Sequence, residues 1–353
     1  PSQILVVTAK LAAEPLASLE MPQTGENGDT YEINFRPDPT LHDGFWANNP
    51  WLQELPKPFT SITWDNAILV SPRTAQRLGI DTEDVVKLTY SEVSIEAPIV
   101  INYGHPDKSI TVHLGYGRTR GGEVLKGTGF DFGKMRTSDA MNFGNGATLQ
   151  KTGTQYALAM VAEHHMIDAK GDTNPANDTV DGTQERDLVR LLDIGEYRKN
   201  AAKPFDLEIE GKPTQTDGGR LEAGKRYADI SLYPEVVGGE DDELGRSIYK
   251  KDQAWDYSED YKWGMAIDLN SCIGCNVCAI ACQAENNIAT VGKTEVKRRR
   301  EMHWIRIDRY QRGGIDNPET YFMPIACMHC ENAPCEPVCP VAATIHSHDG
   351  LNM

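Results

Sequence analysis

Cysteine is absent from the first 271 of the 353 residues, and all eight cysteines lie between Cys272 and Cys339. A secreted protein stabilised by disulfides would spread its cysteines along the chain to join distant loops. Confinement to two tight groups near one end therefore favours metal binding over disulfide bonding.

Long apolar runs are also missing. Hydrophobic residues make up 39% of the chain, the mean hydropathy is −0.48, and the longest apolar runs, such as AILV and PIVI, have the length of strands. A membrane-spanning helix needs about 20 apolar residues, so none of these runs predicts one. No charged and then apolar signal segment opens the sequence, which starts at Pro1, and we expect the true N-terminus to have been removed or to lie elsewhere.

Positive charge is scarce in most of the chain. The net charge is −17, of which residues 1–260 carry −16 and residues 261–353 carry −1. An acidic body argues against a nucleic-acid partner, which would require a basic face. The one basic run, KRRR at 297–300, is interpreted as a solvated loop or strand edge.

Four segments differ in composition, and together they predict a mostly β, α+β chain. Residues 1–57 are rich in Pro, Asn, Asp and Gly and are expected to be an extended segment, the tail of an upstream domain; Phe45, Trp46 and Trp51 are assigned to ordinary packing. Residues 58–167 predict a β-barrel domain. Residues 168–260 are expected to be an acidic connector with one amphipathic helix over 185–200, and residues 261–353 form the cysteine domain.

The barrel prediction depends on short alternating runs separated by turn residues, at 66–70, 84–90, 99–103 and 109–117. A short helix follows the first run, because Ser71 can cap it, Pro72 suits its first turn and Gly79 suits its left-handed end. The glycines of LGYGRTRGG (114–122) indicate tight turns more than phosphate binding. In the cysteine domain, strands are expected over KWGMAIDLNSC (262–272), 303–310 and 321–327.

Two cysteine motifs carry the chemistry. The first is C-x2-C-x2-C-x3-C and the second is C-x2-C-x4-C-x3-C followed by Pro340. Closely spaced cysteines can wrap one loop around a cubane cluster, and in such folds the last cysteine of a motif ligates a neighbouring cluster. Zinc needs four ligands and gives no reason for a third cysteine at the same spacing. We therefore predict iron–sulfur ligation by Cys272, Cys275, Cys278, Cys282, Cys327, Cys330, Cys335 and Cys339.

No competing catalytic group is evident, so the predicted activity is electron transfer and no residue is assigned a catalytic role. The adjacent pair His164 and His165 is interpreted as structural, because neighbouring side chains diverge. His329 lies inside the second motif, where it could donate to a cluster sulfur. His303, His346 and His348 have no ligand spacing.

Eight cysteines could close two cubanes if the motifs exchange their last ligands. Two features instead favour a protein with more than two clusters and with further cysteine motifs. The motifs are separated by 44 residues, and DGLNM (349–353) repeats the glycine-then-apolar pattern that precedes the first motif. We therefore expect the chain to continue beyond Met353 into a third motif.

At these residues the chain resembles a known family. WGMAIDLNSCIGCNVCAIACQAENNI, REMHWIRIDRY and CMHCENAPCEPVCPVAATIHSHDGLNM are similar to the four-cluster ferredoxin subunits of membrane-associated molybdopterin oxidoreductases, above all to the fused iron–sulfur B subunit of bacterial alternative complex III. Residues 58–167, with NAILVSPRTAQRLGI, resemble the C-terminal, dinucleotide-binding-type barrel of molybdopterin oxidoreductases.

The resemblance implies a cluster assignment. Cys272, Cys275 and Cys278 would hold one cluster, and Cys282 would serve the cluster of a motif beyond Met353. Similarly, Cys327, Cys330 and Cys335 would hold another cluster, with Cys339 serving its neighbour. The full subunit would carry [4Fe-4S] clusters with one [3Fe-4S] cluster, and a molybdopterin-like part that has lost its cofactor.

The resemblance also implies a setting: quinol oxidation in a respiratory or photosynthetic complex on the extracytoplasmic (periplasmic) face of the bacterial cytoplasmic membrane. Its partners would be a multihaem c-type cytochrome, integral-membrane quinol-binding subunits and the rest of the same subunit. Two alternatives stay open. One is the electron-transfer subunit of an active molybdopterin reductase of the polysulfide reductase type, and the other is a scaffold with zinc in the cysteine sites.

Overall fold

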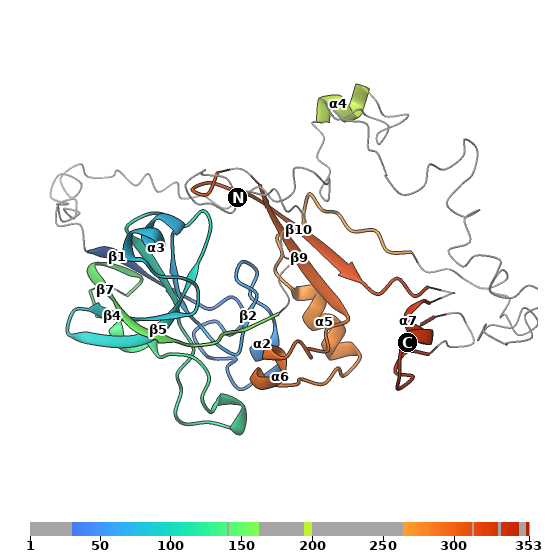
Figure 1. Ribbon diagram of the computed structural model, residues 1–353, viewed down its shortest axis with the longest axis horizontal. Coiled ribbons are helices and arrows are strands. Elements are labelled where there is room, and N and C mark those ends of the chain that lie inside the picture. The colour runs from blue at the N-terminus through green and yellow to red at the C-terminus, as the bar shows by residue number, and fades with distance from the viewer. Residues whose placement is uncertain are drawn as a thin grey trace, which may run out of the picture. The chain divides into compact units, whose positions relative to one another are not determined.

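The computed structural model describes residues 30–139, 141–161, 194–199, 264–312, 314–330, 333–345 and 351–352. The chain divides into two compact units, residues 1–189 with 268–326 and residues 190–267 with 327–353. The first unit contains a barrel and the first cysteine motif, and the second unit contains the second motif (Figure 1).

A closed six-stranded barrel forms the larger part of the first unit, in the strand order β1-β6-β3-β5-β4-β7 (Figure 1). The pairs β1–β6 and β3–β5 are parallel, and the other neighbouring pairs are antiparallel. Closure leaves no unpaired sheet edge. The strands are β1 (Tyr31–Arg36), β3 (Ile68–Val70), β4 (Asp84–Tyr90), β5 (Val93–Ile101), β6 (Ser109–His113) and β7 (Phe143–Gln155).

The barrel begins earlier in the chain than the predicted boundary at residue 58. In β1, Tyr31, Ile33 and Phe35 are buried and alternate with polar residues, which is the period-two pattern of a strand with one buried face. Strand β1 closes the barrel by pairing with β6 and β7, so part of the segment expected to be an extended tail is a barrel strand. Strand β7 carries three glycines and few apolar residues, and it was not predicted.

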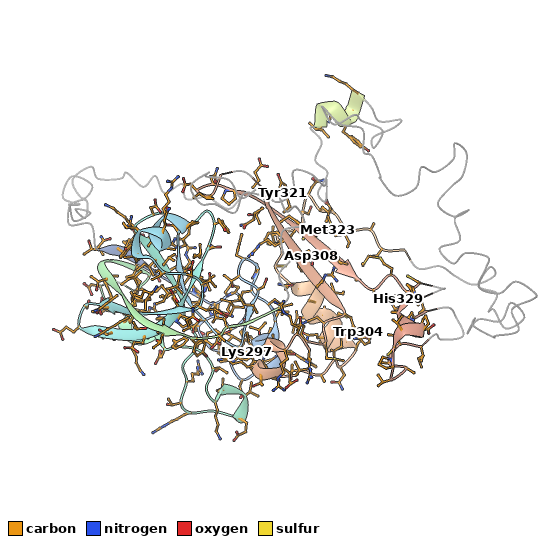
Figure 2. All side chains as sticks on the ribbon, viewed as in Figure 1. Lys297, Trp304, Asp308, Tyr321, Met323 and His329 are labelled. Carbon is orange, nitrogen blue, oxygen red and sulfur yellow. The ribbon has the colours of Figure 1, made fainter. Side chains whose placement is uncertain are left out.

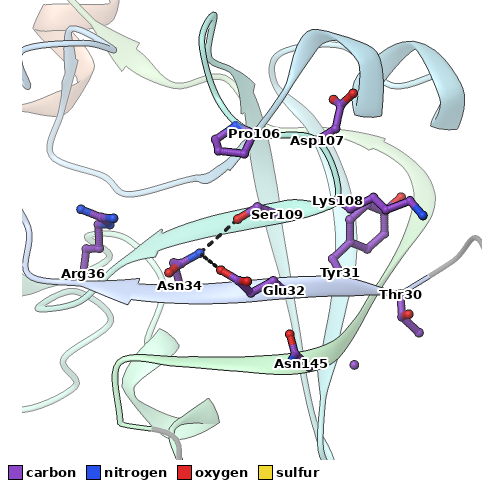
Figure 3. A pocket seen from close by; sticks show the side chains of 11 residues that line it. Thr30, Tyr31, Glu32, Asn34, Arg36, Pro106, Asp107, Lys108, Ser109 and Asn145 are labelled. Atoms are coloured by element: carbon purple, nitrogen blue, oxygen red, sulfur yellow. Dashed lines mark hydrogen bonds between the residues drawn. The ribbon is translucent and has the colours of Figure 1, made fainter. Parts of the chain in front are cut away.

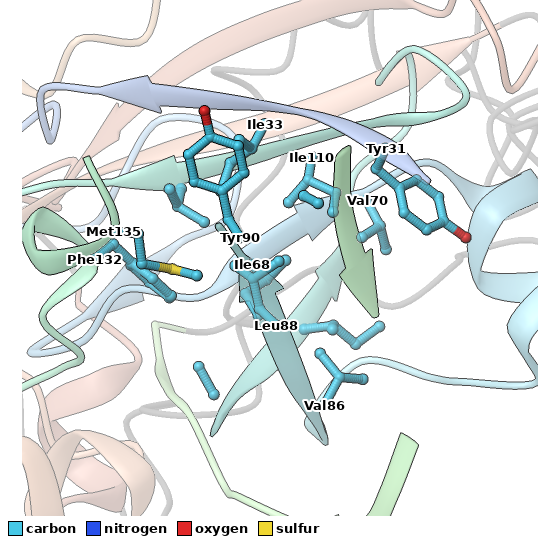
Figure 4. Close-up of a cluster of buried hydrophobic side chains, with 14 of the residues drawn as sticks. Tyr31, Ile33, Ile68, Val70, Val86, Leu88, Tyr90, Ile110, Phe132 and Met135 are labelled. Carbon is cyan, nitrogen blue, oxygen red and sulfur yellow. The ribbon is translucent and has the colours of Figure 1, made fainter. Parts of the chain in front are cut away.

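Side chains from all six strands fill the barrel interior (Figure 4). Ile33, Ile68, Leu88, Ile99 and Ile110 are fully buried there. The short 3-10 helix η2 (Phe132–Met135) closes over this core with Phe132 and Met135, which are also fully buried. Burial of a branched or aromatic side chain stabilises a fold by about 1.5–3 kcal/mol, so this interior is the main source of stability in the barrel.

The short predicted helix is confirmed as α3 (Pro72–Leu78). The Ser71 hydroxyl accepts a hydrogen bond from the Thr74 amide at 3.0 Å, which satisfies one of the free N–H groups of the first turn. Gly79 ends the helix in the left-handed region, with φ 60°, where a residue with a Cβ is disfavoured. The sequence pattern therefore identified both ends of this helix.

A second group of elements in the same unit packs beside the barrel. Helices α2 (Pro50–Glu54), α5 (Val277–Glu285) and α6 (Lys293–Lys297) lie near a hairpin of β9 (Ile305–Arg312) and β10 (Glu319–Ala326), while β2 (Ile62–Thr63) pairs with β8 (Ala159–Met160). A further 3-10 turn is η1 (Glu123–Leu125). The hairpin confirms the strands predicted over 303–310 and 321–327 within a few residues.

Two local predictions differ from the structure. Residues 264–271 form no strand, because the Asp268 side chain accepts hydrogen bonds from the Asn270 amide and the Ser271 hydroxyl and closes a turn instead. Phe45 and Trp46 are 75% and 53% exposed and pack edge-to-face on each other, whereas ordinary core packing was expected. Trp51 does pack, as expected.

Most of the predicted connector lies outside the described residues. The part described is α4 (Ile194–Lys199), which falls inside the helix predicted over 185–200. The histidine pair at 164–165 and most of the acidic stretch lie outside the described ranges, so those predictions stay untested. The basic run begins at the end of α6, and Arg298 and Arg300 both pair with Glu295 at the protein surface.

Buried charges cross the boundary between the barrel and α6. The Lys293 ammonium lies 2.7 Å from the Asp65 carboxylate, which is fully buried, and Lys293 also donates to the Tyr156 hydroxyl. Burial raises the pKa of Asp65 and the nearby Lys293 opposes that shift. Lys57, also buried, donates to the Asp65 carbonyl at 2.9 Å. A buried ion pair of this kind is costly to break from one side only.

His113 should make the barrel sensitive to acid. Burial lowers the pKa of His113 to about 4. The Asp38 carboxylate opposes this shift, whereas the positive charges of Lys57 and Arg36 add to it. The folded imidazole is then neutral, while the unfolded one takes up a proton near pH 6.5, so stability is present above pH 6.5 and is lost as the pH falls from 6.5 towards 4. Between pH 7 and 4.5, we expect the free energy of unfolding of the wild type to fall by about 2 kcal/mol more than that of His113→Gln.

Urea unfolding followed by tryptophan fluorescence at the two pH values measures this difference. His42, which is exposed, provides the matched control, since His42→Gln should retain the wild-type pH dependence. Equal losses in wild type and His113→Gln would contradict the assignment of the acid sensitivity to His113.

Candidate metal centre

The first cysteine motif joins an irregular loop to a helix. Cys272 and Cys275 lie in the loop, and Cys278 and Cys282 lie one turn apart on α5. The loop bends through the left-handed region at Gly274, with φ 67°, and at Asn276, with φ 61°. These two bends flank Cys275 and give the loop its irregular path between Cys272 and the start of α5.

The thiols of the first motif affect one another electrostatically. Desolvation raises the pKa of the Cys278 thiol, and the neighbouring thiols of Cys275 and Cys272 raise it further, because they would place negative charges beside it. The Cys282 sulfur lies 3.7 Å from the Asn286 side-chain amide. The assignment of Cys272, Cys275 and Cys278 to one cluster stays a prediction.

The second motif, in the other unit, surrounds one sulfur with backbone N–H groups. Cys335 begins the short helix α7 (Cys335–Val338), and Cys339 follows it. The Ala343 amide donates to the Cys339 sulfur at 3.1 Å. The Ala343 amide has the largest effect on the pKa of Cys339, which it lowers because it stabilises the thiolate. The amides of residues 341, 344 and 342 lower this pKa further. Thiolates are the form that binds iron, and amide bonds to sulfur tune cluster potentials.

His329 makes one contact in the described part of its unit, and the prediction that it could donate to a cluster sulfur stays untested. Its Nδ1 lies 2.8 Å from the Asn352 carbonyl oxygen (Figure 2 labels His329). The Asn352 side-chain oxygen lies 3.8 Å from the Cys335 sulfur. His329 thus contacts the segment at 351–352, and that segment contacts the motif. His346 and His348 lie outside the described residues.

Helix α2 holds the segment after the first motif through Glu54, its last residue. The Glu54 side chain is fully buried, and its carboxylate accepts hydrogen bonds from the Val291 and Gly292 amides at 2.7–3.0 Å. The Trp64 indole donates to the same carboxylate at 3.1 Å. These amides open helix α6, where a negative charge is favourable. Sequence reasoning missed Glu54, because nothing in its local pattern marks it.

Two further contacts anchor the cysteine loop and helix α5. The Asn276 side chain, between Cys275 and Cys278, donates to the Pro56 carbonyl at 2.8 Å. The Trp51 indole donates to the Ile288 carbonyl, just beyond α5, at 2.7 Å. The loop that carries three predicted ligands is therefore held on both sides by residues 51–56.

Gly274 is required by close packing as well as by its backbone angle. A Cβ at this position would lie 2.3 Å from Cδ1 of the Phe322 ring on β10. We expect Gly274→Ala to destabilise the first unit by about 2–5 kcal/mol, because left-handed strain and overpacking add. Thermal unfolding and the iron and acid-labile sulfide content per chain measure the effect.

Gly153→Ala is the matched control. Gly153 also has a positive φ, of 81°, but a Cβ there meets nothing within 4 Å. That variant should lose only about 1–2 kcal/mol and keep its iron. Equal losses in the two variants would show that Phe322 does not restrict the loop.

A separate cavity lies on the outside of β1 and β6, with a volume of about 640 Å³ (Figure 3). Its wall carries both charge signs, from Glu32, Arg36, Asp107 and Lys108. The Asn34 amide donates to Glu32 and to Ser109 across this wall. No cysteine lines this cavity, so we assign it no part in the metal centre.

Two features are absent from the described ranges. Among those residues, no three His, Cys, Asp or Glu side chains are gathered as a site for a single metal ion. Nor does any helix within them combine the length and apolar character needed to cross a membrane.

The comparisons with known proteins concern the cysteine domain. Residues 271–343 match the 4Fe-4S dicluster domain family. The chain is 39% identical over 90 residues to the iron–sulfur cluster-binding subunit of menaquinone reductase from Nitratidesulfovibrio vulgaris, covering 25% of this chain and 35% of that protein. It is 35% identical over 97 residues to the B subunit of tetrathionate reductase from Salmonella typhimurium, covering 26% and 33%.

A third relative is the Hdr-like menaquinol oxidoreductase iron–sulfur subunit 1 of Archaeoglobus fulgidus, 30% identical over 108 residues, covering 26% of this chain and 39% of that subunit. The chain thus spans about a third of the length of the curated relatives it matches. The match and the eight cysteines show that this region binds iron–sulfur clusters, and the region is similar to the iron–sulfur subunits of reductase and oxidoreductase complexes.

Proposed function

We propose that this chain is the iron–sulfur electron-transfer subunit of a membrane quinol-oxidising complex of the alternative complex III type. The observation that carries the proposal is the pairing of a closed barrel with a region that matches the dicluster domain in one chain. Relatives named as menaquinone reductase and menaquinol oxidoreductase subunits support a quinone-linked role. The barrel is proposed to be of the molybdopterin oxidoreductase C-terminal type.

The partners follow from the same proposal. They are integral-membrane quinol-binding subunits as electron source, a multihaem c-type cytochrome as acceptor, and the rest of the subunit, on the periplasmic face of the membrane. The chain would carry [4Fe-4S] clusters and, with the rest of the subunit, one [3Fe-4S] cluster. In this proposal Cys272, Cys275 and Cys278 hold one cluster, Cys327, Cys330 and Cys335 hold another, and Cys282 and Cys339 each serve a neighbour.

A bound cluster supplies one-electron exchange, and the residues of this chain position it. Two left-handed bends shape the loop that carries the first cysteines, and the contacts of Asn276 and Trp51 hold that loop and its helix against residues 51–56. The amides around Cys339 stabilise a thiolate. A rigid mounting keeps the distance between redox centres constant, which an electron-transfer subunit requires.

Low-temperature EPR of the purified complex tests this proposal. Signals of reduced [4Fe-4S] and oxidised [3Fe-4S] clusters are expected, and quinol added to the complex should reduce them. A complex without any cluster signal would overturn electron transfer, and zinc without acid-labile sulfide would identify a zinc scaffold instead.

A second candidate function is supported by one of the relatives, the B subunit of tetrathionate reductase. In that case the chain would be the electron-transfer subunit of an active molybdopterin reductase, of the polysulfide reductase type. Elemental analysis distinguishes the two functions: stoichiometric molybdenum or tungsten favours the reductase, and its absence from a complex that oxidises quinol favours alternative complex III.

A further inference from the structure

A cavity of about 340 Å³ lies between strand β9, the start of α5 and the 56–61 loop. Apolar side chains make up much of its wall, among them Val161, Ile305 and Ile307. The polar groups come mainly from the segment that leads into β9, namely Glu301 and His303, and from Arg306 and Asp308 within the strand. Figure 2 labels Asp308 on β9 and Trp304 just before the strand.

The cavity adjoins the first cysteine motif. Asn276 and Ala279, which line it, each follow directly after a predicted cluster ligand, Cys275 and Cys278. Two unit charges about 10 Å apart in a protein still change each other's equilibrium by roughly tenfold. A charge gained on one wall is therefore felt on the other.

His303 is the unusual group in this wall. Both of its ring nitrogens are shielded from solvent, and no protein group in the described part of the chain is within hydrogen-bonding reach of either. The Glu301 Oε2 oxygen is in the same condition. By contrast, both ring nitrogens of His105 have protein partners, at 2.9 and 3.1 Å. A buried polar group without a partner is costly and calls for a functional explanation.

The charges around His303 are few. From its own segment, Glu301 carries a carboxylate, and Arg306 pairs with Asp308 at 2.9 Å, so that those two charges offset each other. The residues that line the cavity from the other elements, Pro56, Ser61, Val161, Asn276 and Ala279, are neutral. Burial lowers the pKa of His303 and Glu301 opposes that shift. His303 is thus neutral near pH 7, with one adjacent carboxylate that favours its charged form.

We propose that this cavity is a redox-linked proton site, in which His303 binds a proton when the neighbouring cluster gains an electron. The proposal rests on the proposed electron-transfer function, since it needs a reducible cluster at the first motif. The electron comes from the donor of the complex and adds one negative charge to the cluster. The proton comes from solvent, through water that the cavity is large enough to hold, and binds one imidazole nitrogen of His303.

Oxidation reverses both transfers, so that charge and protons balance over a cycle. Glu301 is the positioning residue, because its carboxylate stabilises the imidazolium that forms. No bond other than the N–H bond of His303 is made or broken in this step.

EPR-monitored redox titration of the full complex, at pH 5 to 7.5, tests the proposal. The signal of the first cluster is identified by its loss or change in Cys275→Ser. We expect its equilibrium constant for reduction to be roughly tenfold larger at pH 5 than at pH 7.5, because protonated His303 stabilises the reduced state. His303→Gln should remove this dependence, and Glu301→Gln should move it to lower pH.

The matched control is His42→Gln, which changes an exposed histidine outside the cavity wall and should retain the wild-type dependence. A reduction equilibrium independent of pH in wild type, or an unchanged dependence in His303→Gln, would overturn the proton site alone. A complex with no reducible cluster at any pH would overturn the proposed function together with it.

Discussion

Cys275→Ser is expected to remove or convert the cluster at the first motif and to destabilise the segment 268–326. A serine hydroxyl is a poorer iron ligand than a thiolate at neutral pH. Because metal binding is coupled to folding, the free energy of cluster binding no longer stabilises the loop and helix α5. The expected loss of unfolding free energy is several kcal/mol, on the scale of structural metal sites.

Two measurements check this result: the EPR spectrum of the cluster and the denaturation midpoint of the purified chain. Cys282→Ser provides an informative comparison, since the predicted ligand assignment places that residue on a different cluster. The two variants should therefore alter different signals. If Cys275→Ser left the spectrum and the stability unchanged, the assignment of Cys275 as a ligand would be wrong.

Glu54→Ala is expected to release the α6 segment from α2. The fully buried carboxylate accepts from two backbone amides and one indole, and its removal leaves three buried donors without a partner. Each lost hydrogen bond to a charged group is worth roughly 1.5–3 kcal/mol, with incomplete additivity. We expect a loss of about 3–5 kcal/mol, most of it in the contact between α2 and residues 288–297.

Native-state hydrogen exchange at the Val291 and Gly292 amides is the direct measurement, because these are the groups that lose their acceptor. Glu123→Ala is the matched control: that side chain is 85% exposed and pairs with Lys126 at the surface. Its removal should change stability by less than about 0.5 kcal/mol. Unchanged protection of the two amides in Glu54→Ala would mean that the carboxylate does not hold this segment.

The cofactor and several local elements could be predicted from short stretches. The spacing of the cysteines predicted iron–sulfur chemistry, and the dicluster match confirms it. Ser71, Pro72 and Gly79 predicted both ends of α3, because capping is an interaction between residues close in sequence. Strand β4 was predicted from the short alternating run DVVKLTY, which is bounded by turn residues.

Other strands were missed for identifiable reasons. Strand β1 has a clear alternation, but it stands in a stretch rich in Pro, Asn and Asp that was interpreted as a tail. Strand β7 is polar and glycine-bearing, and it is a strand because β1 and β4 offer it two ladders of hydrogen-bond partners. The turn at Asp268 replaced a predicted strand, since a local side-chain bond competed with the extended backbone.

The sequence by itself determined the kind of cofactor and the candidate ligands, because those depend on residue type and spacing within a few turns of chain. Only the tertiary structure decided how the first cysteine loop is held and what lies beside it. Glu54 meets Val291 across 237 residues, and Asn276 meets Pro56 across 220. The isolated imidazole of His303 likewise becomes evident only once β9, the start of α5 and the 56–61 loop enclose a common cavity. No local pattern encodes contacts of that range, because they follow from the packing of residues 51–61 against the cysteine segment.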